Sequence, residues 1–372
     1  MEDKIFIRVG IKTLGEPQVR KSGKLTSLDN MLIGDGFHWQ DSIKAILPGK
    51  VESFEDGSNI SLINILPLED YVECVVGSEM NPAAPVEFIK AHAVISRGWA
   101  LGKILRVHPS CCIPETDSDK IVGWDDSGEH IGFDVCSDDH CQRYQGLQDI
   151  SPQTLEAIKE TEGLVIIDSN GNLADTRFSK CCGGVTELFS TCWHSEDFNF
   201  LRSLEDPWCN LSNLSPVRRR ILLSTILKDY DQKTEGYGFR WNHEISKEEV
   251  RNNLRLKFGL EIGEIIRLEP LHRGPSGRID LLRIVGGEKN INIGKELWIR
   301  RLLSDSHLYS SAFEIEDMGE RVRLKGRGWG HGVGLCQIGA ANMAANGFNY
   351  QDILKFYYPE TSLARINEKI IN

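Results

Sequence analysis

Apolar and polar residues alternate through most of the first 66 positions of the chain. The stretches KIFIRVGI (4–11), HWQDSIKAIL (38–47) and NISLINIL (59–66) follow this period of two, and turn-forming residues such as EDGSN (55–59) lie between them. Alternation of this kind, interrupted by Gly, Asp and Ser, is typical of short antiparallel strands joined by hairpins. The pattern therefore predicts an N-terminal β-rich segment over residues 1–66.

The period changes to that of a helix after residue 66. Apolar residues recur at helical spacing from Leu68 to Val76. Pro82 and Pro85 interrupt this pattern, because proline has no place in a helix interior. Pro85 is well suited to the first turn of a second helix over residues 85–105. We expect two helices joined by a proline break.

Helical and strand patterns follow one another irregularly in the rest of the chain. Helices are expected over residues 151–163, 216–235, 245–258 and 350–358, with Ser151 and Ser246 as N-caps. Strands are expected over residues 164–169, 173–180 and 262–300. Residues 105–150 and 183–215 show neither period and are predicted to be loops. This order predicts an α+β protein with mixed antiparallel strands, a helical central segment and loop-rich insertions.

Composition and charge narrow the class of protein. The chain has 372 residues, of which 40% are hydrophobic and 26% charged, as in ordinary globular proteins. Its formal net charge of -11 argues against nucleic acid as a partner. No apolar run approaches the roughly 18 residues that a transmembrane segment needs. The N-terminus, MEDKIFIRVGIK, has no basic start followed by an apolar core, so we expect no signal peptide in this chain.

A run of alternating glycines marks residues 326–334, GRGWGHGVG, and encloses Trp329 and His331. Glycine costs backbone entropy, so such a run indicates an unusual conformation or a close backbone approach. The run lacks the Lys-Ser/Thr ending of a P-loop and the acidic residue of a dinucleotide fold. It is therefore not predicted to bind phosphate.

Four potential metal ligands lie within the twelve residues HIGFDVCSDDHC: His130, Cys136, His140 and Cys141. Thiolate and imidazole are the usual ligands of tetrahedral zinc. The spacing differs from a CxxC knuckle, and a Cys136–Cys141 disulfide or two thiols remain alternatives. A metal here would fix a loop that has no hydrophobic core of its own.

Five motifs occur in one order along residues 60–361: LPLEDYVECVVGSEMNPAAPVEFIKAHAVISRGWA, FDVCSDDHCQRYQG, CCGGVTE, GRIDLLRIVG and GRGWGHGVGLCQIGAANMAANGF followed by ILKFYYPET. Together they resemble the stage II sporulation protein D family, which includes the amidase-enhancer proteins. The resemblance implies a lytic transglycosylase that cuts the MurNAc–GlcNAc bonds of peptidoglycan, with a preference for peptide-stripped glycan strands. It also implies a location outside the cytoplasm, in the periplasm or cell envelope, and a structural zinc bound by Cys and His in the second motif.

The resemblance carries the family's catalytic glutamate onto Glu79. A lytic transglycosylase needs one carboxyl group, which protonates the leaving oxygen and then takes the proton of the muramic acid 6-hydroxyl, whereas a glycosidase uses two. The functional Lys and Arg of the family map onto Lys90 and Arg97, two turns apart on one helical face. These two side chains and His331 are expected to line a glycan groove with Glu79.

Further substrate contacts are expected from Gly183 and Gly184, from Gln337 and from Trp329, which would form a wall of the groove. The chain departs from the family where Phe178 replaces a tyrosine and Cys336 replaces a serine. Glu187 stays open as a second carboxylate.

The expected organisation has four parts: an N-terminal β-rich segment (1–66), a catalytic and metal-binding region (67–215), an α/β insertion or second subdomain (216–310), and a glycine-rich C-terminal part that completes the catalytic core (311–372). Two alternative functions remain. One is a non-catalytic peptidoglycan-binding protein that stimulates a cell-wall amidase, and the other is a hydrolytic glycosidase acting on another polysaccharide.

Overall fold

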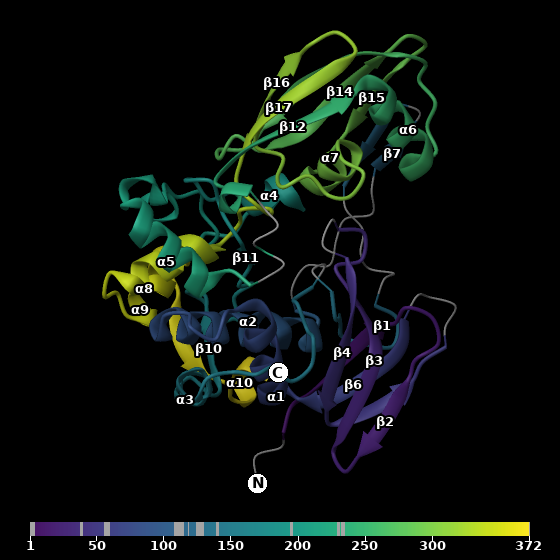
Figure 1. The fold of residues 1–372 in the computed structure, drawn as a ribbon. Helices are drawn as coiled ribbons and strands as arrows, with labels where there is room; N and C mark the ends of the chain where they lie inside the picture. Colours follow the sequence, from purple (N-terminus) through teal and green to yellow (C-terminus); the bar gives the residue numbers. More distant parts are fainter. Residues whose placement is uncertain are drawn as a thin grey trace.

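The computed structural model describes residues 4–37, 40–55, 60–107, 115–117, 119–123, 130–138, 141–193, 196–228, 231 and 235–371. Helices and strands both contribute large parts of it, in several small mixed sheets (Figure 1). The α+β class expected from the sequence is confirmed. No helix in these ranges is both long enough and apolar enough to cross a bilayer.

The N-terminal segment forms two small sheets, as its alternating pattern predicted. The strands of the first are β1 (Phe6–Lys12), β5 (Lys50–Ser53), β6 (Ile60–Pro67) and β9 (Val135–Cys136), and those of the second are β2 (Val19–Ser22), β3 (Leu25–Ile33) and β4 (Asp41–Pro48). β1 pairs antiparallel with β6 and parallel with β9. β9 belongs to a region predicted to be a loop, and it brings Cys136 beside Gly10.

Two helices follow this sheet, α1 (Leu68–Glu79) and α2 (Val86–Leu105), so the proline-separated pair is confirmed. α2 is buried on almost every side. It contacts α1 and four further elements, namely α3 (Pro152–Glu160), β10 (Leu164–Ile167), α8 (Gln337–Ala345) and α9 (Tyr350–Tyr357). These contacts place α2 at the centre of the larger hydrophobic core.

A second core lies at the top of Figure 1 and draws its residues from Trp241 to Leu324. One of its sheets contains β12 (Arg240–Ser246), β17 (Arg321–Arg327) and β16 (Phe313–Asp317). The other contains β13 (Ile265–Arg273), β14 (Ile279–Gly286), β15 (Asn290–Ile293), β8 (Lys120–Val122) and β7 (Glu115–Asp117). α6 (Lys247–Phe258) and α7 (Glu296–Leu302) pack against these sheets. The division of the chain into four parts stays a prediction.

Several element boundaries differ from those predicted. The helix expected over 216–235 is α5 (Pro216–Ile226), and the helix expected from residue 245 is preceded by β12 and begins at Lys247. Ser246 and Glu249 form the predicted capping box. Residues 296–302, predicted to be part of a strand region, are the helix α7.

The strand expected over 173–180 is reduced to β11 (Phe178–Ser179), which pairs with β18 (Leu335–Cys336). β10 pairs along its length with β19 (Ser362–Arg365) and meets Leu173 at a single bridge. The predicted loop 183–215 contains short helical turns, α4 (Phe189–Cys192), η1 (Pro207–Cys209) and η2 (Leu211–Asn213). The chain also contains η4 (Glu235–Gly238) and α10 (Glu368–Ile371). Pairing with distant segments decided the extent of β10 and β11, and local sequence contains no signal for such pairing.

Candidate functional site

Glu79 is the last residue of α1, where the helix gives way to an extended Met80. Its side chain is buried, with 6% of its surface exposed. The segment that follows Cys141 crosses this helix end: the Arg143 amide donates to Glu79 Oε1 at 3.2 Å and the Gln145 amide donates to Ser78 Oγ at 3.0 Å. The first bond orients the carboxylate, and the second fixes the crossing segment against the helix end.

A buried ionic cluster surrounds this helix end. Asp231 is fully buried and accepts from Arg143 Nη1 and from Lys180 Nζ, each at 3.0 Å. Burial alone would raise the pKa of Asp231, but Lys180 and Arg143 outweigh this effect and lower it. Asp231 is therefore an ionised carboxylate with both oxygens occupied by cations.

Lys228 is the third cation of this cluster. Its ammonium donates to the Gly77 carbonyl in the last turn of α1. Burial lowers the pKa of Lys228 to about 8, against the opposing attraction of the Asp231 and Glu79 carboxylates. Lys228 therefore changes its charge near pH 8, within the pH range of an activity assay.

Lys90 and Arg97 lie on α2 but are held by other acidic residues. Lys90 Nζ pairs with Glu87 at 2.9 Å and Glu160 at 2.7 Å. Arg97 is fully buried and forms a bidentate pair with Glu69, at 2.7 and 2.8 Å. These contacts occupy both side chains without a glycan, and the expected role of the two residues in substrate binding stays a prediction.

The glycine run lies against the segment 177–182. Cys181 and Trp329 exchange backbone hydrogen bonds at 3.1 and 2.7 Å. A Cβ atom on Gly334, which has a φ of +70°, would lie 2.1 Å from the Arg177 carbonyl oxygen. On Gly332, with a φ of +79°, it would lie 2.4 Å from the Arg278 guanidinium. The close backbone approach predicted for this run is therefore confirmed.

The two side chains enclosed by the run face separate neighbours. Trp329 is buried and meets Tyr309 edge to face. His331 accepts from the Val333 amide through Nδ1 at 3.0 Å and lies against Trp193, with ring centroids 4.9 Å apart. Burial, reinforced by nearby arginines, lowers the pKa of His331, so its ring is neutral. The described contacts do not join His331 to Glu79.

The remaining predicted substrate residues pack against backbone or against other buried groups. A Cβ on Gly183 would lie 2.8 Å from the Gly328 amide nitrogen, whereas Gly184 has more space around it. Gln337 is buried, with Nε2 at 3.1 Å from His92 Nε2, and burial lowers the pKa of His92 to about 3. Contact of these residues with a sugar stays a prediction.

Five residues of this region were not singled out in the sequence: Arg143, Lys180, Lys228, Asp231 and Arg278. Arg143 and Arg278 lie inside quoted motifs and Lys180 directly precedes one, so those motifs were a signal. Lys228 and Asp231 lie in a stretch without any motif. Arg278 is fully buried and donates to the carbonyls of Cys182 and Gly330 and to Ser276 Oγ.

Glu187, left open above as a second carboxylate, is bound elsewhere. It is fully buried, and its Oε2 accepts from the Ser276 hydroxyl at 2.6 Å and from the Ser276 amide at 3.2 Å. Its Oε1 accepts from the Leu188 amide. Glu187 therefore fixes the turn that precedes β14.

Three of the four predicted metal ligands come together. The Sγ atoms of Cys136 and Cys141 and a ring nitrogen of His130 lie within 4.8 Å of one another, and Cys141 Sγ is 3.5 Å from His130 Nε2. The two cysteines form no disulfide with each other. His140 lies outside the described residues. This donor set fits a metal ion with a preference for thiolate and imidazole.

A second group of potential ligands was not predicted as a metal site. It consists of Cys182, Asp206, Cys209 and Cys336, all of them buried. Their ligating atoms also lie within 4.8 Å of one another.

Comparison with known proteins agrees with these motifs. Residues 56–167 match the family described as Stage II sporulation protein. This stretch of the chain is thus similar to the Stage II sporulation protein domain. Residues 187–334 match a domain of unknown function. The resemblance stated from the sequence is thus confirmed, and the Stage II sporulation protein domain spans α1, α2 and Glu79.

The similarity to known proteins extends beyond residues 56–167 in comparisons with individual relatives. Stage II sporulation protein D of Bacillus subtilis (strain 168) is 26% identical over 307 residues, which cover 82% of this chain and 77% of that protein. An uncharacterized protein of Brachyspira hyodysenteriae is 25% identical over 360 residues, covering 97% of this chain and 81% of the relative. The amidase enhancer of Bacillus subtilis is 22% identical over 317 residues, 78% of this chain but 39% of the relative.

Proposed function

We propose that this protein is a lytic transglycosylase that cleaves MurNAc–GlcNAc bonds in peptidoglycan, with Glu79 as its single general acid and base. The Stage II sporulation protein domain and its relatives support a role connected with sporulation or the cell wall. The observation that carries the finer proposal is the environment of Glu79. The Glu79 carboxylate is oriented by the Arg143 amide and attracts the half-buried Lys228 ammonium, while the neighbouring carboxylate, Asp231, is occupied by Arg143 and Lys180.

The reaction needs two proton transfers through one group. Protonated Glu79 gives its proton to the glycosidic oxygen as the bond from that oxygen to C1 of MurNAc breaks. The 6-hydroxyl oxygen of the same sugar then bonds to C1, and its proton passes to the Glu79 carboxylate. The products are a 1,6-anhydromuramic end and a free GlcNAc 4-hydroxyl. The positive charge of Lys228 and the hydrogen bond from the Arg143 amide stabilise the ionised form of Glu79 between these two steps.

Hydrolysis is less well supported by the same geometry. A hydrolytic glycosidase uses a second carboxylate as nucleophile or as base for a water molecule. Asp231 is fully buried with both oxygens bound to cations, and Glu187 is bound to Ser276 and Leu188. Neither carboxylate is positioned to activate water.

Product analysis tests the reaction type. Peptide-stripped glycan strands incubated with the protein are expected to yield fragments that end in 1,6-anhydromuramic acid, because an internal hydroxyl replaces water. Mass spectrometry separates this end from a hydrated reducing end by the mass of one water molecule. Strands that keep their peptides serve as the control and show whether cleavage requires prior removal of the peptides. Hydrated ends would show hydrolysis and would overturn the proposal.

The charge of Lys228 predicts the alkaline side of the pH profile. Cleavage is expected to decline as the pH rises through about 8, because Lys228 then becomes neutral and stops stabilising ionised Glu79. Arginine keeps its charge throughout this range, so Lys228→Arg should move the decline to higher pH. Lys228→Met should be impaired below about pH 8, where wild-type Lys228 is charged, and should approach wild type above it. Profiles of kcat/KM measure this, and an unchanged decline in Lys228→Arg would exclude Lys228 as its source.

A second candidate function is stimulation of a cell-wall amidase, which the name of one relative favours. In that case the protein would bind glycan strands without cleaving them. Adding it to an amidase with intact peptidoglycan should then raise peptide release, and the Glu79→Gln variant should be as effective. For either function we propose that the protein works outside the cytoplasm, where peptidoglycan lies.

We also propose that His130, Cys136 and Cys141 hold a structural zinc ion. Their nitrogen and two sulfur atoms already lie within 4.8 Å of one another. When bound, zinc would supply a rigid cross-link between the loop after β9 and the residues before it. That loop leads directly to Arg143, whose amide orients Glu79.

A further inference from the structure

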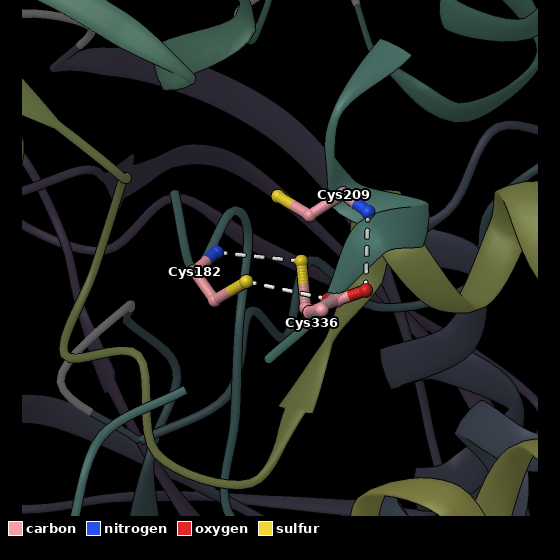
Figure 2. A group of neighbouring side chains, drawn as sticks. Cys182, Cys209 and Cys336 are labelled. Carbon is pink, nitrogen blue, oxygen red and sulfur yellow. Dashed lines mark hydrogen bonds between the residues drawn. The ribbon is translucent and has the colours of Figure 1, made fainter. Parts of the chain in front are cut away.

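We propose a second zinc site, formed by Cys182, Asp206, Cys209 and Cys336, that is structural and separate from the cluster at His130. Figure 2 shows the side chains of the three cysteines converging from three separate segments of the chain, with their sulfur atoms facing one another. The segments are the loop after β11, the helical turn η1, and the junction between β18 and α8. The chain thus assembles a complete set of four ligands only in the folded state.

The distances suit a tetrahedral ion. A zinc–sulfur distance of about 2.3 Å places sulfur ligands about 3.8 Å apart. The four ligating atoms here lie within 4.8 Å of one another, and Cys182 Sγ is 3.3 Å from Asp206 Oδ2. Small inward movements of the side chains would therefore complete the coordination. Four protein ligands without an open position are typical of a structural site.

The charges in this pocket also indicate a cation. The hydrogen-bond partners of Asp206 in the described structure are the Tyr357 hydroxyl, the Cys182 thiol and the amides of Trp208 and Cys209, and none of them is positively charged. A buried carboxylate without a cation is costly. A zinc ion would supply the missing positive charge and would convert the thiols to thiolates.

The surroundings are arranged for thiolates. Cys336 Sγ accepts from two backbone amides, those of Cys182 and Gly339, at 3.3 and 3.4 Å. It caps the N-terminus of α8, where the helix dipole favours a negative charge. Cys182 Sγ accepts from the Gly184 amide at 3.4 Å. Such outer contacts fix and tune the ligands of metal sites.

Tyr357 provides an outer contact for the carboxylate ligand. Its hydroxyl donates to Asp206 Oδ2 at 2.9 Å, and Asp206 Oδ1 accepts the two amides of η1. The carboxylate is thereby held with Oδ2 directed toward the thiols. Because the carboxylate is already directed in this way, little rearrangement is needed to bind a metal ion.

A disulfide is the main alternative for these cysteines. Cys181 Sγ and Cys209 Sγ are 3.4 Å apart, well beyond the length of about 2.05 Å for an S–S bond. A Cys181–Cys209 disulfide would remove one zinc ligand and would require an oxidant. The two states are therefore exclusive, and metal analysis under reducing conditions distinguishes them.

The site would anchor the segments that carry Lys180 and Gln337. Cys182 follows Lys180, which pairs with Asp231, and Cys336 precedes Gln337, which contacts His92. A zinc ion would thus join β11 and β18 at the ends of their short pairing. Its loss should lower the melting temperature of the whole chain.

The test uses the whole 372-residue chain with Cys136→Ser and Cys141→Ser, which removes the first cluster. After purification with zinc under reducing conditions, mass spectrometry of the metal content is expected to show about one zinc ion per chain. Adding Cys209→Ser and Cys336→Ser should abolish it, whereas Cys192→Ser, which replaces a buried cysteine outside the group, should leave it unchanged.

Two further measurements test the site while all four proposed zinc ligands are kept. Cobalt(II) in place of zinc should give the thiolate-to-cobalt charge-transfer band and the intense visible bands of a tetrahedral site. Tyr357→Phe should weaken zinc binding by about tenfold, measured by competition with a coloured chelator, because the carboxylate loses its outer contact. Absence of zinc and of the cobalt spectrum, metal unaffected by Cys209→Ser and Cys336→Ser, or a Cys181–Cys209 disulfide in the reduced preparation would each overturn the proposal.

Discussion

Replacing Glu79 by glutamine is expected to lower the rate of glycan cleavage by about 10²- to 10⁴-fold, the usual contribution of a general acid or base. Glutamine has the same shape, and its carbonyl oxygen can still accept from the Arg143 amide that holds Glu79. It cannot give a proton to the glycosidic oxygen or take one from the 6-hydroxyl. The loss should therefore appear in kcat, with little change in glycan binding.

Glu73→Gln is the matched control for this variant. Glu73 lies on the same helix and makes the same chemical change, but it is only half-buried and lies outside the ionic cluster around Asp231. Release of anhydromuramic fragments, followed by chromatography, should be close to wild type in the control. Equal activity of Glu79→Gln and wild type would remove Glu79 as the catalytic acid.

Replacing Arg97 by methionine is expected to lower the free energy of unfolding by about 2 kcal/mol, because it removes the buried guanidinium of an ion pair and leaves the partly exposed Glu69 behind. Arg97 is fully buried, and its guanidinium joins Glu69 on α1 and the Leu164 carbonyl on β10 to α2. Methionine fills a similar volume, but of the partners of Glu69 in the described part of the chain the Gly163 amide alone would be left. Urea denaturation measures the change. Lysine should restore only part of it, because it lacks the bidentate geometry.

Lys90→Met on the same helix provides the comparison. Its partners Glu87 and Glu160 are partly exposed, with Glu160 at 52% of its side-chain surface, so the cost should stay below about 1 kcal/mol. The glycan affinity of the folded variants distinguishes a structural role of Arg97 from a role in substrate binding. If Arg97→Met unfolds like wild type but binds peptide-stripped strands much more weakly, Arg97 acts on the substrate.

The sequence alone predicted the elements that carry a strong local signal. The alternating N-terminal strands, the proline-separated helices α1 and α2 and the Ser246 capping box are all confirmed. The close backbone approach of the glycine run is also confirmed, because glycine at alternate positions permits the positive φ angles and short backbone distances seen there. In each case the pattern lies within one element and reflects its own period, cap or backbone freedom.

Only the tertiary structure decided which other elements and side chains these elements contact. It brought β7 and β8 into the sheet of the second core, gave Arg97 a partner in Glu69, and gathered Lys180, Lys228 and Asp231 around the end of α1. It also brought Cys182 and Cys336, 154 positions apart, to hydrogen-bond distance. A sequence pattern shows the period of the helix or strand that contains it. Buried charges and thiols are positioned instead by packing between distant segments, and the distance between two segments in space cannot be read from their separation in the sequence.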